Sequence, residues 1–426
     1  MLFQKIFFTF IFAVGAFTER TWAEGDFQGS THLVRFDEGN KKPTNAVAEL
    51  QKRIERAETI LKFSPEHGYL DSVLARLKIF PSSQVLVFSQ TSFQRDLISP
   101  RTPRALFFND DTYVGFIPGA PLLEISTADS NLGGVFYTVA QHAETKPRFN
   151  RENQCLECHA SARTMGVPGH LLRSLFTDEN GRPNLSTDIS DVTHRTPFPD
   201  RWGGWYVTST IGEASHRGNL IGQPNSRDPH QPELPSKNVQ DLKLFFDVSR
   251  YPQNSSDQVA LLVLEHQIHL HNFLTRLHFE TDDKLSAYGH INYVTNIANA
   301  FLKYLLFTEE APLPGHIVGN STFVQDFSKQ GPFDQRGRSL RDFDLETRLF
   351  KYPCSYLIYS KAFDALPGPM KKYLYQRLYD ILTGKDQSDD FSNLSRKMGH
   401  EIFEILLDTK KDLPSYWKTG FKPGKI

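Results

Sequence analysis

Tyr113-Val114-Gly115-Phe116-Ile117 is one of five short runs of β-branched and aromatic residues that lie between positions 84 and 140. The other four are Val85-Leu86-Val87-Phe88, Ala105-Leu106-Phe107-Phe108, Leu122-Leu123-Glu124-Ile125 and Val135-Phe136-Tyr137-Thr138-Val139. The segments that separate them include the turn formers Asn109-Asp110-Asp111, Pro118-Gly119 and Gly133-Gly134. Apolar runs that alternate with Gly, Pro and Asp are typical of antiparallel strands joined by tight turns. These runs predict a β meander.

Helical periodicity flanks the β-rich stretch on both sides. Before it, apolar residues recur at spacings of three and four over 46–61, and a second such piece covers 69–77. After it, Asp257 precedes an apolar run over 259–277 and can cap a helix there. Three later runs also predict helices, at 297–306, 373–382 and 398–407. The sequence therefore predicts an α+β fold, with an antiparallel meander in the N-terminal half and a mainly helical C-terminal half.

Composition limits the class of protein. The chain has 426 residues, of which 39% are hydrophobic and 12% aromatic, so it can bury a large core and is not a disordered protein. Its formal net charge is −1, which gives no sign of a nucleic-acid partner. We divide it into a leader (1–23), a helical lead-in with the β-rich region (24–149), a loop-rich segment (150–235) and a helical region (236–426).

The N-terminus has the pattern of a secretory signal peptide. Lys5 precedes an apolar run over 6–17, and Thr21-Trp22-Ala23 supplies small residues where a signal peptidase cleaves, so we expect cleavage near Ala23. A membrane anchor is the less favoured alternative, because the run is shorter than the roughly 20 apolar residues of a span. No other long uncharged apolar run follows. We expect a periplasmic or secreted protein with no membrane span after cleavage.

The loop-rich segment contains Cys155-Leu156-Glu157-Cys158-His159. Two thiols at this spacing can each add across a haem vinyl group, and the adjacent histidine then ligates the iron. Covalent haem attachment is completed outside the cytoplasm in bacteria, which agrees with export. The run occurs once, so the sequence predicts at most one haem c. The third cysteine, Cys354, stands among bulky apolar residues and is predicted to be a buried, inert thiol.

Other uses of the two thiols stay open. A zinc site needs a second pair of ligands, and the usual second Cys-x-x-Cys or His pair is missing. A redox-active dithiol usually stands in a strand-to-helix βαβ context, which the surrounding pattern lacks. A structural disulfide is a further alternative. Separately, Glu265, His266 and His269 lie close together on one predicted helix and are a candidate for an independent metal site.

The opposite side of the iron has several candidate ligands: Met165, His170, His216, His266, His269 and His271. A strong sixth ligand favours electron transfer, whereas an open position permits binding and catalysis. We favour His170 as the second metal ligand beside His159, because the bend Pro168-Gly169 can carry the chain around the haem edge. Arg163 and Arg173, close to the attachment point, are candidates to pair with the haem propionates.

The Cys-x-x-Cys-His run resembles the attachment motif of c-type cytochromes. The resemblance implies one covalent haem c, its iron, and single-electron exchange with a periplasmic redox partner. It covers five residues, and the sequence lacks a recognisable methionine ligand in a downstream loop. The wider chain also resembles a family of large secreted single-haem bacterial proteins of unassigned activity. That likeness is carried by Arg101-Thr102-Pro103-Arg104-Ala105, His159-Ala160-Ser161-Ala162-Arg163-Thr164 and Pro353-Cys354-Ser355-Tyr356-Leu357-Ile358-Tyr359.

Three functions follow as expectations. The first is a periplasmic c-type cytochrome that binds one covalent haem and transfers single electrons. The second is a single-haem peroxidase or oxidase with an open distal site, which the length of the chain favours, because an electron shuttle needs fewer residues. The third is a non-haem protein whose thiols serve a structural or dithiol role.

Overall fold

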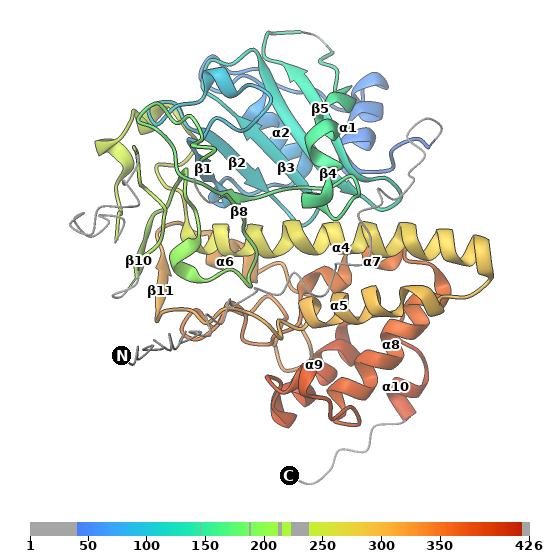
Figure 1. Ribbon diagram of the computed structural model, residues 1–426. Coiled ribbons are helices and arrows are strands. Elements are labelled where there is room, and N and C mark those ends of the chain that lie inside the picture. Colours follow the sequence, from blue (N-terminus) through green and yellow to red (C-terminus); the bar gives the residue numbers. More distant parts are fainter. Residues whose placement is uncertain (1–40, 145, 187–188, 212–214, 223–237, 420–426) are drawn as a thin grey trace, which may run out of the picture.

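The computed structural model describes residues 41–144, 146–186, 189–211, 215–222 and 238–419 (Figure 1). The predicted signal peptide, its cleavage near Ala23 and the alternative membrane anchor lie outside the described residues. Within them, no helix is long and apolar enough to cross a membrane.

A seven-stranded antiparallel sheet with the order β6-β5-β4-β3-β2-β1-β9 forms the N-terminal half. Its strands are β1 (Val85–Val87), β2 (Arg104–Phe108), β3 (Thr112–Phe116), β4 (Leu122–Asp129), β5 (Gly133–Ala140), β6 (Asn150–Arg151) and β9 (Trp205–Tyr206). The five predicted strands pair in chain order, so the meander is confirmed. The loop-rich segment adds β6 and β9 to the two edges of this sheet.

Two further ladders lie outside the main sheet. They pair β7 (Arg173–Ser174) with β8 (Ser190–Asp191), and β10 (Ser209–Ile211) with β11 (Ile317–Gly319).

The two faces of the sheet contribute to different cores. Val114 and Phe116 pack in a core with α1 (Ala46–Glu55) and α2 (Leu70–Leu77). Tyr113, the residue before Val114, belongs to the larger core that includes α4 (Gln258–Tyr288). Successive side chains of a strand point to opposite faces, which explains this division. Figure 1 shows α1 and α2 on one side of the sheet and α4 running along the other.

The first helix is shorter than predicted. The pattern over 46–61 predicts a helix that includes Ala57, but α1 ends at Glu55. Ala57 adopts a left-handed conformation with φ 57°, and the amide of Glu58 donates a hydrogen bond of 2.8 Å back to the carbonyl of Arg53. A left-handed residue of this kind ends a helix and turns the chain. Leu61 is buried although it lies after the end of the helix, so an apolar residue at this spacing indicates burial and not helix.

The central element is α4, which is capped as predicted and is longer than predicted. Asp257 accepts hydrogen bonds from the amides of Val259 and Ala260, and Gly289 with φ 73° ends the helix. Most of its first 24 residues are buried, polar ones included, because the sheet lies on one side and other helices on the other (Figure 1). Those helices are α5 (Thr295–Leu305), α6 (Phe323–Ser328), α7 (Lys361–Asp364), α8 (Gly368–Leu382), α9 (Arg396–Thr409) and α10 (Tyr416–Thr419). The α+β class is thereby confirmed.

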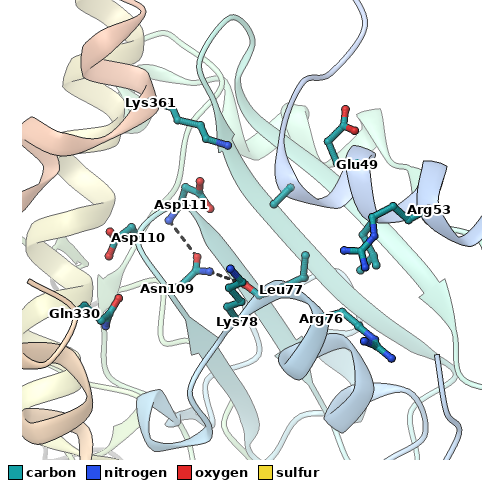
Figure 2. A pocket seen from close by; sticks show the side chains of 12 residues that line it. Glu49, Arg53, Arg76, Leu77, Lys78, Asn109, Asp110, Asp111, Gln330 and Lys361 are labelled. Carbon is teal, nitrogen blue, oxygen red and sulfur yellow. Dashed lines mark hydrogen bonds between the residues drawn. The ribbon is translucent and has the colours of Figure 1, made fainter. Parts of the chain in front are cut away.

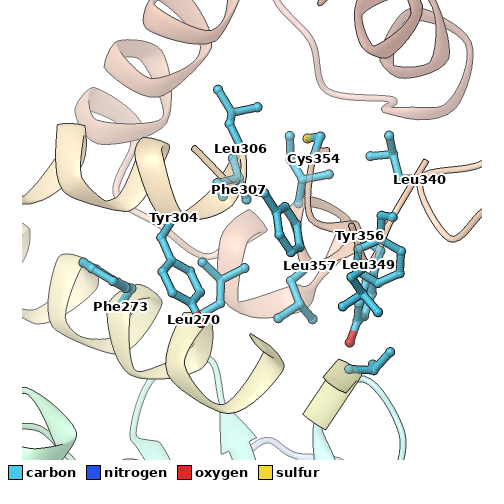
Figure 3. Close-up of a cluster of buried hydrophobic side chains, with 14 of the residues drawn as sticks. Leu270, Phe273, Tyr304, Leu306, Phe307, Leu340, Leu349, Cys354, Tyr356 and Leu357 are labelled. Carbon is cyan, nitrogen blue, oxygen red and sulfur yellow. The ribbon is translucent and has the colours of Figure 1, made fainter. Parts of the chain in front are cut away.

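The larger core also contains the third cysteine. Cys354 is fully buried in the same cluster as Leu306, Phe307 and Leu357 (Figure 3). Burial raises the pKa of its thiol to about 12. The predicted burial is therefore confirmed, and the raised pKa agrees with the expectation of an inert thiol.

Candidate functional site

The Cys-x-x-Cys-His run leaves the edge of the sheet directly after β6. Cys155 ends a 3-10 turn, and α3 (Leu156–His159) carries the other two residues of the motif. Cys158 is exposed and Cys155 is partly buried, and neither forms a disulfide. The short helix places both thiols and the imidazole at one surface site, next to β5 and the outermost strand.

His159 is tied to Gly169 by two hydrogen bonds. Its Nδ1 donates to the carbonyl oxygen of Gly169 at 3.0 Å, and the amide of Gly169 donates to the carbonyl of His159 at 2.8 Å. A carbonyl can only accept, so the proton of the neutral ring is on Nδ1 and the lone pair is on Nε2. Nε2 makes no hydrogen bond to the described part of the chain. Metal-ligating histidines are oriented in this way by a carbonyl on the other nitrogen.

The surroundings of His159 keep its ring neutral. Burial lowers its pKa to about 4, against the hydrogen bond to Gly169, and the positive charges of Arg104 and Arg173 lower it further. The imidazole is therefore unprotonated on Nε2 across the physiological range, which is the form that binds a metal.

The loop between His159 and His170 is held by β5 and α4. The amide of Gly134 donates to the carbonyl of Pro168 at 2.8 Å. Asn272 on α4 accepts from the amide of His170 and donates to its carbonyl, both at 2.9 Å. A Cβ on Gly169 would lie 2.2 Å from Oδ1 of Asn272, so this close approach requires glycine.

The structure brings His170 close to His159. The ring of Phe136 on β5 lies 4.7 Å from the ring of His159 and 5.6 Å from that of His170. His170 is 5% exposed, and neither of its ring nitrogens has a hydrogen-bond partner among the residues that the structure describes. Burial lowers its pKa well below the usual value, and His159 and His271 contribute in the same direction. Burying the ring nitrogens of an imidazole without hydrogen bonds costs free energy. Such a ring indicates a position where a group bound to the protein can interact with these nitrogens.

Three other candidate ligands on α4 are engaged elsewhere. His266 forms hydrogen bonds of 2.8 Å through Nδ1 to Nδ1 of His194 and through Nε2 to Oγ of Ser355. His271 donates from Nε2 to the carbonyl of Asp110 at 2.8 Å, and the ring of His269 packs on Tyr304. Within the described chain, none of the three has a ring contact or hydrogen bond with His159.

The last two candidates, His216 and Met165, lie in the loop-rich segment and make contacts away from His159. His216 packs against Trp202 with ring centroids 5.2 Å apart, and its Nδ1 accepts the amide of Gly218. Met165 has a left-handed backbone, and its carbonyl accepts a hydrogen bond from Arg276 on α4.

The proposed independent metal site on α4 does not form. The carboxylate of Glu265 accepts hydrogen bonds from Arg201 and, at 3.0 Å, from Nε1 of Trp202. Burial raises its pKa to about 7 in spite of the arginine. Among the described residues, no three His, Cys, Asp or Glu side chains are grouped so as to hold a metal ion.

Three arginines stand near the motif. Arg163 pairs with Asp191 at 3.1 Å, and both side chains are partly exposed. Arg173 affects His159 electrostatically, as noted above. Arg104 on β2 also acts on His159; it lies across Gly115 and pairs with Glu124 at 2.5 Å. The sequence did not indicate Arg104 as a site residue. Its proximity to His159 depends on how the strands pair, which the spacing of residues in the sequence does not show.

The thiol of Cys155 is poorly suited to dithiol exchange. Partial burial, followed by the negative charges of Glu124 and Glu152, raises its pKa to about 11. Exchange proceeds through the thiolate, and reactive Cys-x-x-Cys pairs have a lowered pKa instead. The site therefore disfavours the dithiol alternative.

No protein-family model, curated protein or solved structure matches this chain. The residues at the site nevertheless fit a haem c. They provide an accessible thiol at Cys158, a second thiol one helical turn away, and an imidazole whose Nε2 is unprotonated and without a partner.

Proposed function

We propose that the protein is a periplasmic c-type cytochrome that carries one covalent haem c and transfers single electrons. The observation that carries the proposal is the hydrogen bond from Nδ1 of His159 to Gly169, which orients an unprotonated Nε2 as a ligand. Cys155 and Cys158 would form the two thioether bonds. A periplasmic redox partner would supply or accept the electron, because the matured protein would be exported.

The haem would supply an iron that cycles between the ferric and ferrous states. The chain's own residues fix the ring of His159 and set the charge around it. The double link to Gly169 prevents rotation of the imidazole, and Arg104 and Arg173 add positive charge near it. Positive charge near a haem favours the reduced state, so Arg173 would raise the reduction potential, whereas Glu124 offsets the charge of Arg104.

For the sixth position, His170 remains our candidate. Among the described residues it is the one histidine that packs against the same phenylalanine as His159, and neither of its ring nitrogens has a hydrogen-bond partner there. Because Phe136 packs against both rings, ligation by His170 would require the phenylalanine to move aside.

A haem enzyme, such as a peroxidase or oxidase with an open distal site, is the second candidate. It is favoured by the engagement of His266 and His271 in hydrogen bonds and by the position of Phe136. The absorption spectrum of the matured protein separates the two. A low-spin, six-coordinate ferric spectrum that becomes high-spin in His170→Ala supports the cytochrome, whereas a high-spin spectrum that shifts with cyanide supports the enzyme.

Covalent attachment itself is tested by a haem stain after denaturing electrophoresis. The full chain is expressed with a bacterial cytochrome c maturation system, beside Cys155→Ala/Cys158→Ala and the control Cys354→Ala. We expect stain in the wild type and in the control, and none in the double variant. Absence of stain from the wild type would contradict the proposal.

A further inference from the structure

A pocket of about 460 Å³ opens where the two layers on either side of the sheet meet. Its walls come from α1, α2, the turn between β2 and β3, and the segments around Gln330 and Lys361 (Figure 2). The turn Asn109-Asp110-Asp111 lines one side of the pocket, which we call its floor (Figure 2).

The pocket carries an excess of uncompensated positive charge. Four exposed basic residues line it and form no ion pair with the described part of the chain: Arg53, Arg76, Lys78 and Lys361. Of the three carboxylates of the lining, two form ion pairs with residues outside it and the third, Asp111, keeps its negative charge, so the four unpaired cations exceed it by three. Glu49 pairs with Lys52 at 2.6 Å, Asp110 pairs with Arg341 at 2.5 Å, and Asp111 accepts the hydroxyl of Thr112 at 2.8 Å. A concave site of this kind attracts an anion.

The floor of the pocket is hydrogen-bonded to α4. The carbonyl of Asp110 accepts from Nε2 of His271 at 2.8 Å, and the carbonyl of Asn109 accepts from Nε2 of Gln267 at 2.7 Å. Gln267 also donates to the hydroxyl of Tyr113 at 2.9 Å. These contacts fix the turn against the buried polar face of α4.

A continuous series of rings connects this floor with the Cys-x-x-Cys-His site. The ring of His271 lies 6.4 Å from that of Tyr113, and Tyr113 lies 4.6 Å from His170. His170 lies 5.6 Å from Phe136, which lies 4.7 Å from His159. His170 and Tyr113 are buried, so water does not interrupt the series. Electron transfer through a protein slows steeply with distance, and closely spaced rings shorten each step.

We infer that the pocket binds a small anionic molecule that exchanges one electron with the haem, and that the ring series carries this electron to His159. The inference rests on the proposed function, because it needs the haem. The donor loses one electron and ferric iron becomes ferrous iron. No bond forms and no proton moves, so the rings return to their starting state.

The binding step is tested with hexacyanoferrate(III), a trianion that accepts one electron, on the matured and fully oxidised protein, where no net reaction occurs. Titration calorimetry at low ionic strength compares the wild type with Arg76→Gln/Lys78→Gln. The matched control is Lys62→Gln/Lys243→Gln, two exposed lysines outside the pocket. We expect saturable binding that weakens about tenfold in the pocket variant and is unchanged in the control. Equal binding by all three proteins, or none by the wild type, would overturn the inference.

The route is tested by stopped-flow oxidation of the reduced protein with saturating hexacyanoferrate(III). Tyr113→Phe keeps a ring at this position, and Tyr113→Leu removes it. We expect the limiting rate of Tyr113→Phe to stay near that of the wild type and the rate of Tyr113→Leu to fall well below it. Equal rates in the two variants would overturn the route. The haem stain and the resting spectrum of each variant are recorded first: a stained, spectrally normal protein with equal rates refutes the route alone, whereas an unstained wild type refutes the proposed function.

Discussion

His159 and Gly169 form a reciprocal pair in which the side chain of the histidine donates to the glycine carbonyl and the glycine amide donates to the histidine carbonyl. The pair closes a loop of nine residues, 160–168, directly after the cysteines. Pro168, the last residue of this loop, is hydrogen-bonded to β5, and His170, just after Gly169, is hydrogen-bonded to α4. The orientation of the imidazole is thus set by the sheet and the central helix together.

Gly169→Ala is expected to destabilise the protein. Its Cβ would meet Oδ1 of Asn272 at 2.2 Å, so the loop or the helix must shift, at a cost of about 1–3 kcal/mol. Gly368→Ala is the comparison, because nothing other than its chain neighbours lies within 4 Å of a Cβ at that position. It should cost less than Gly169→Ala, since only the following Pro369 restricts an alanine there. Urea unfolding followed by circular dichroism measures both, and equal stabilities would contradict the close packing at Gly169.

Asn272→Ala should cost about 3 kcal/mol of unfolding free energy, because it leaves the buried amide and carbonyl of His170 without partners. Asn292→Ala, at an exposed position, should change stability by less than about 0.5 kcal/mol. The haem content and spectrum of Asn272→Ala should also differ from those of the wild type if the helix positions the loop. An unchanged stability of Asn272→Ala would show that the two hydrogen bonds between Asn272 and His170 do not stabilise the fold.

The folded protein should lose stability as the pH falls below about 6.5, the ordinary value for histidine. Burial lowers the pKa of eight histidines, namely His159, His170, His194, His216, His266, His269, His271 and His278. Below their unfolded pKa the unfolded chain binds more protons than the folded one, so acid favours unfolding. Each imidazole adds up to about 1.4 kcal/mol per pH unit until its own folded pKa is reached.

Four carboxyl groups oppose this trend, because burial raises their pKa: Asp191, Asp257, Glu265 and Glu310. For Glu265 and Glu310 the pKa is raised to about 7, so between the ordinary carboxyl value and pH 7 the folded state binds their protons more tightly. Eight imidazoles outweigh four carboxyls, and the net slope should be a loss of stability towards acid. Urea midpoints at pH 7.5, 6.5 and 5.5 test the sign. A midpoint that rises towards pH 5.5 would contradict the neutral burial of these histidines.

Cys354 should behave as an inert core residue. Cys354→Ala removes one sulfur from a packed cluster and should cost about 1 kcal/mol, with haem attachment unaffected. In the native protein made without haem maturation, a thiol reagent should label the exposed Cys158 and leave Cys354 unmodified. Labelling of Cys354 before unfolding would contradict its burial.

The strands and the main helices could be predicted from the sequence, because each has a local pattern of apolar residues bounded by turn-forming or capping residues. The runs around Tyr113 and Val135 alternate with turn formers, and Asp257 marks the start of the central helix. The end of α1 at Glu55 was not predictable, since the apolar spacing continues to Leu61 and the left-handed turn at Ala57 leaves no mark in composition.

At the candidate site, the sequence indicates the residues of the motif. It does not indicate the residues that pack against His159 or form hydrogen bonds with the loop after it. Phe136, Gly169 and Asn272 come from three separate segments, and only the fold brings them together. The presence of Gly169 in a bend was visible, but its role as acceptor for His159 was not. The candidate metal site at Glu265 is not formed among the described residues, because Arg201, 64 positions earlier, donates to its carboxylate, which helical spacing cannot show.

The most direct test of the central claim is the intact mass of the exported, matured protein, with peptide mapping of the segment that contains Cys155 and Cys158. The account predicts an added mass of one haem, located on the peptide with both cysteines and His159. A mature chain with no added mass, or with a disulfide between Cys155 and Cys158, would contradict it.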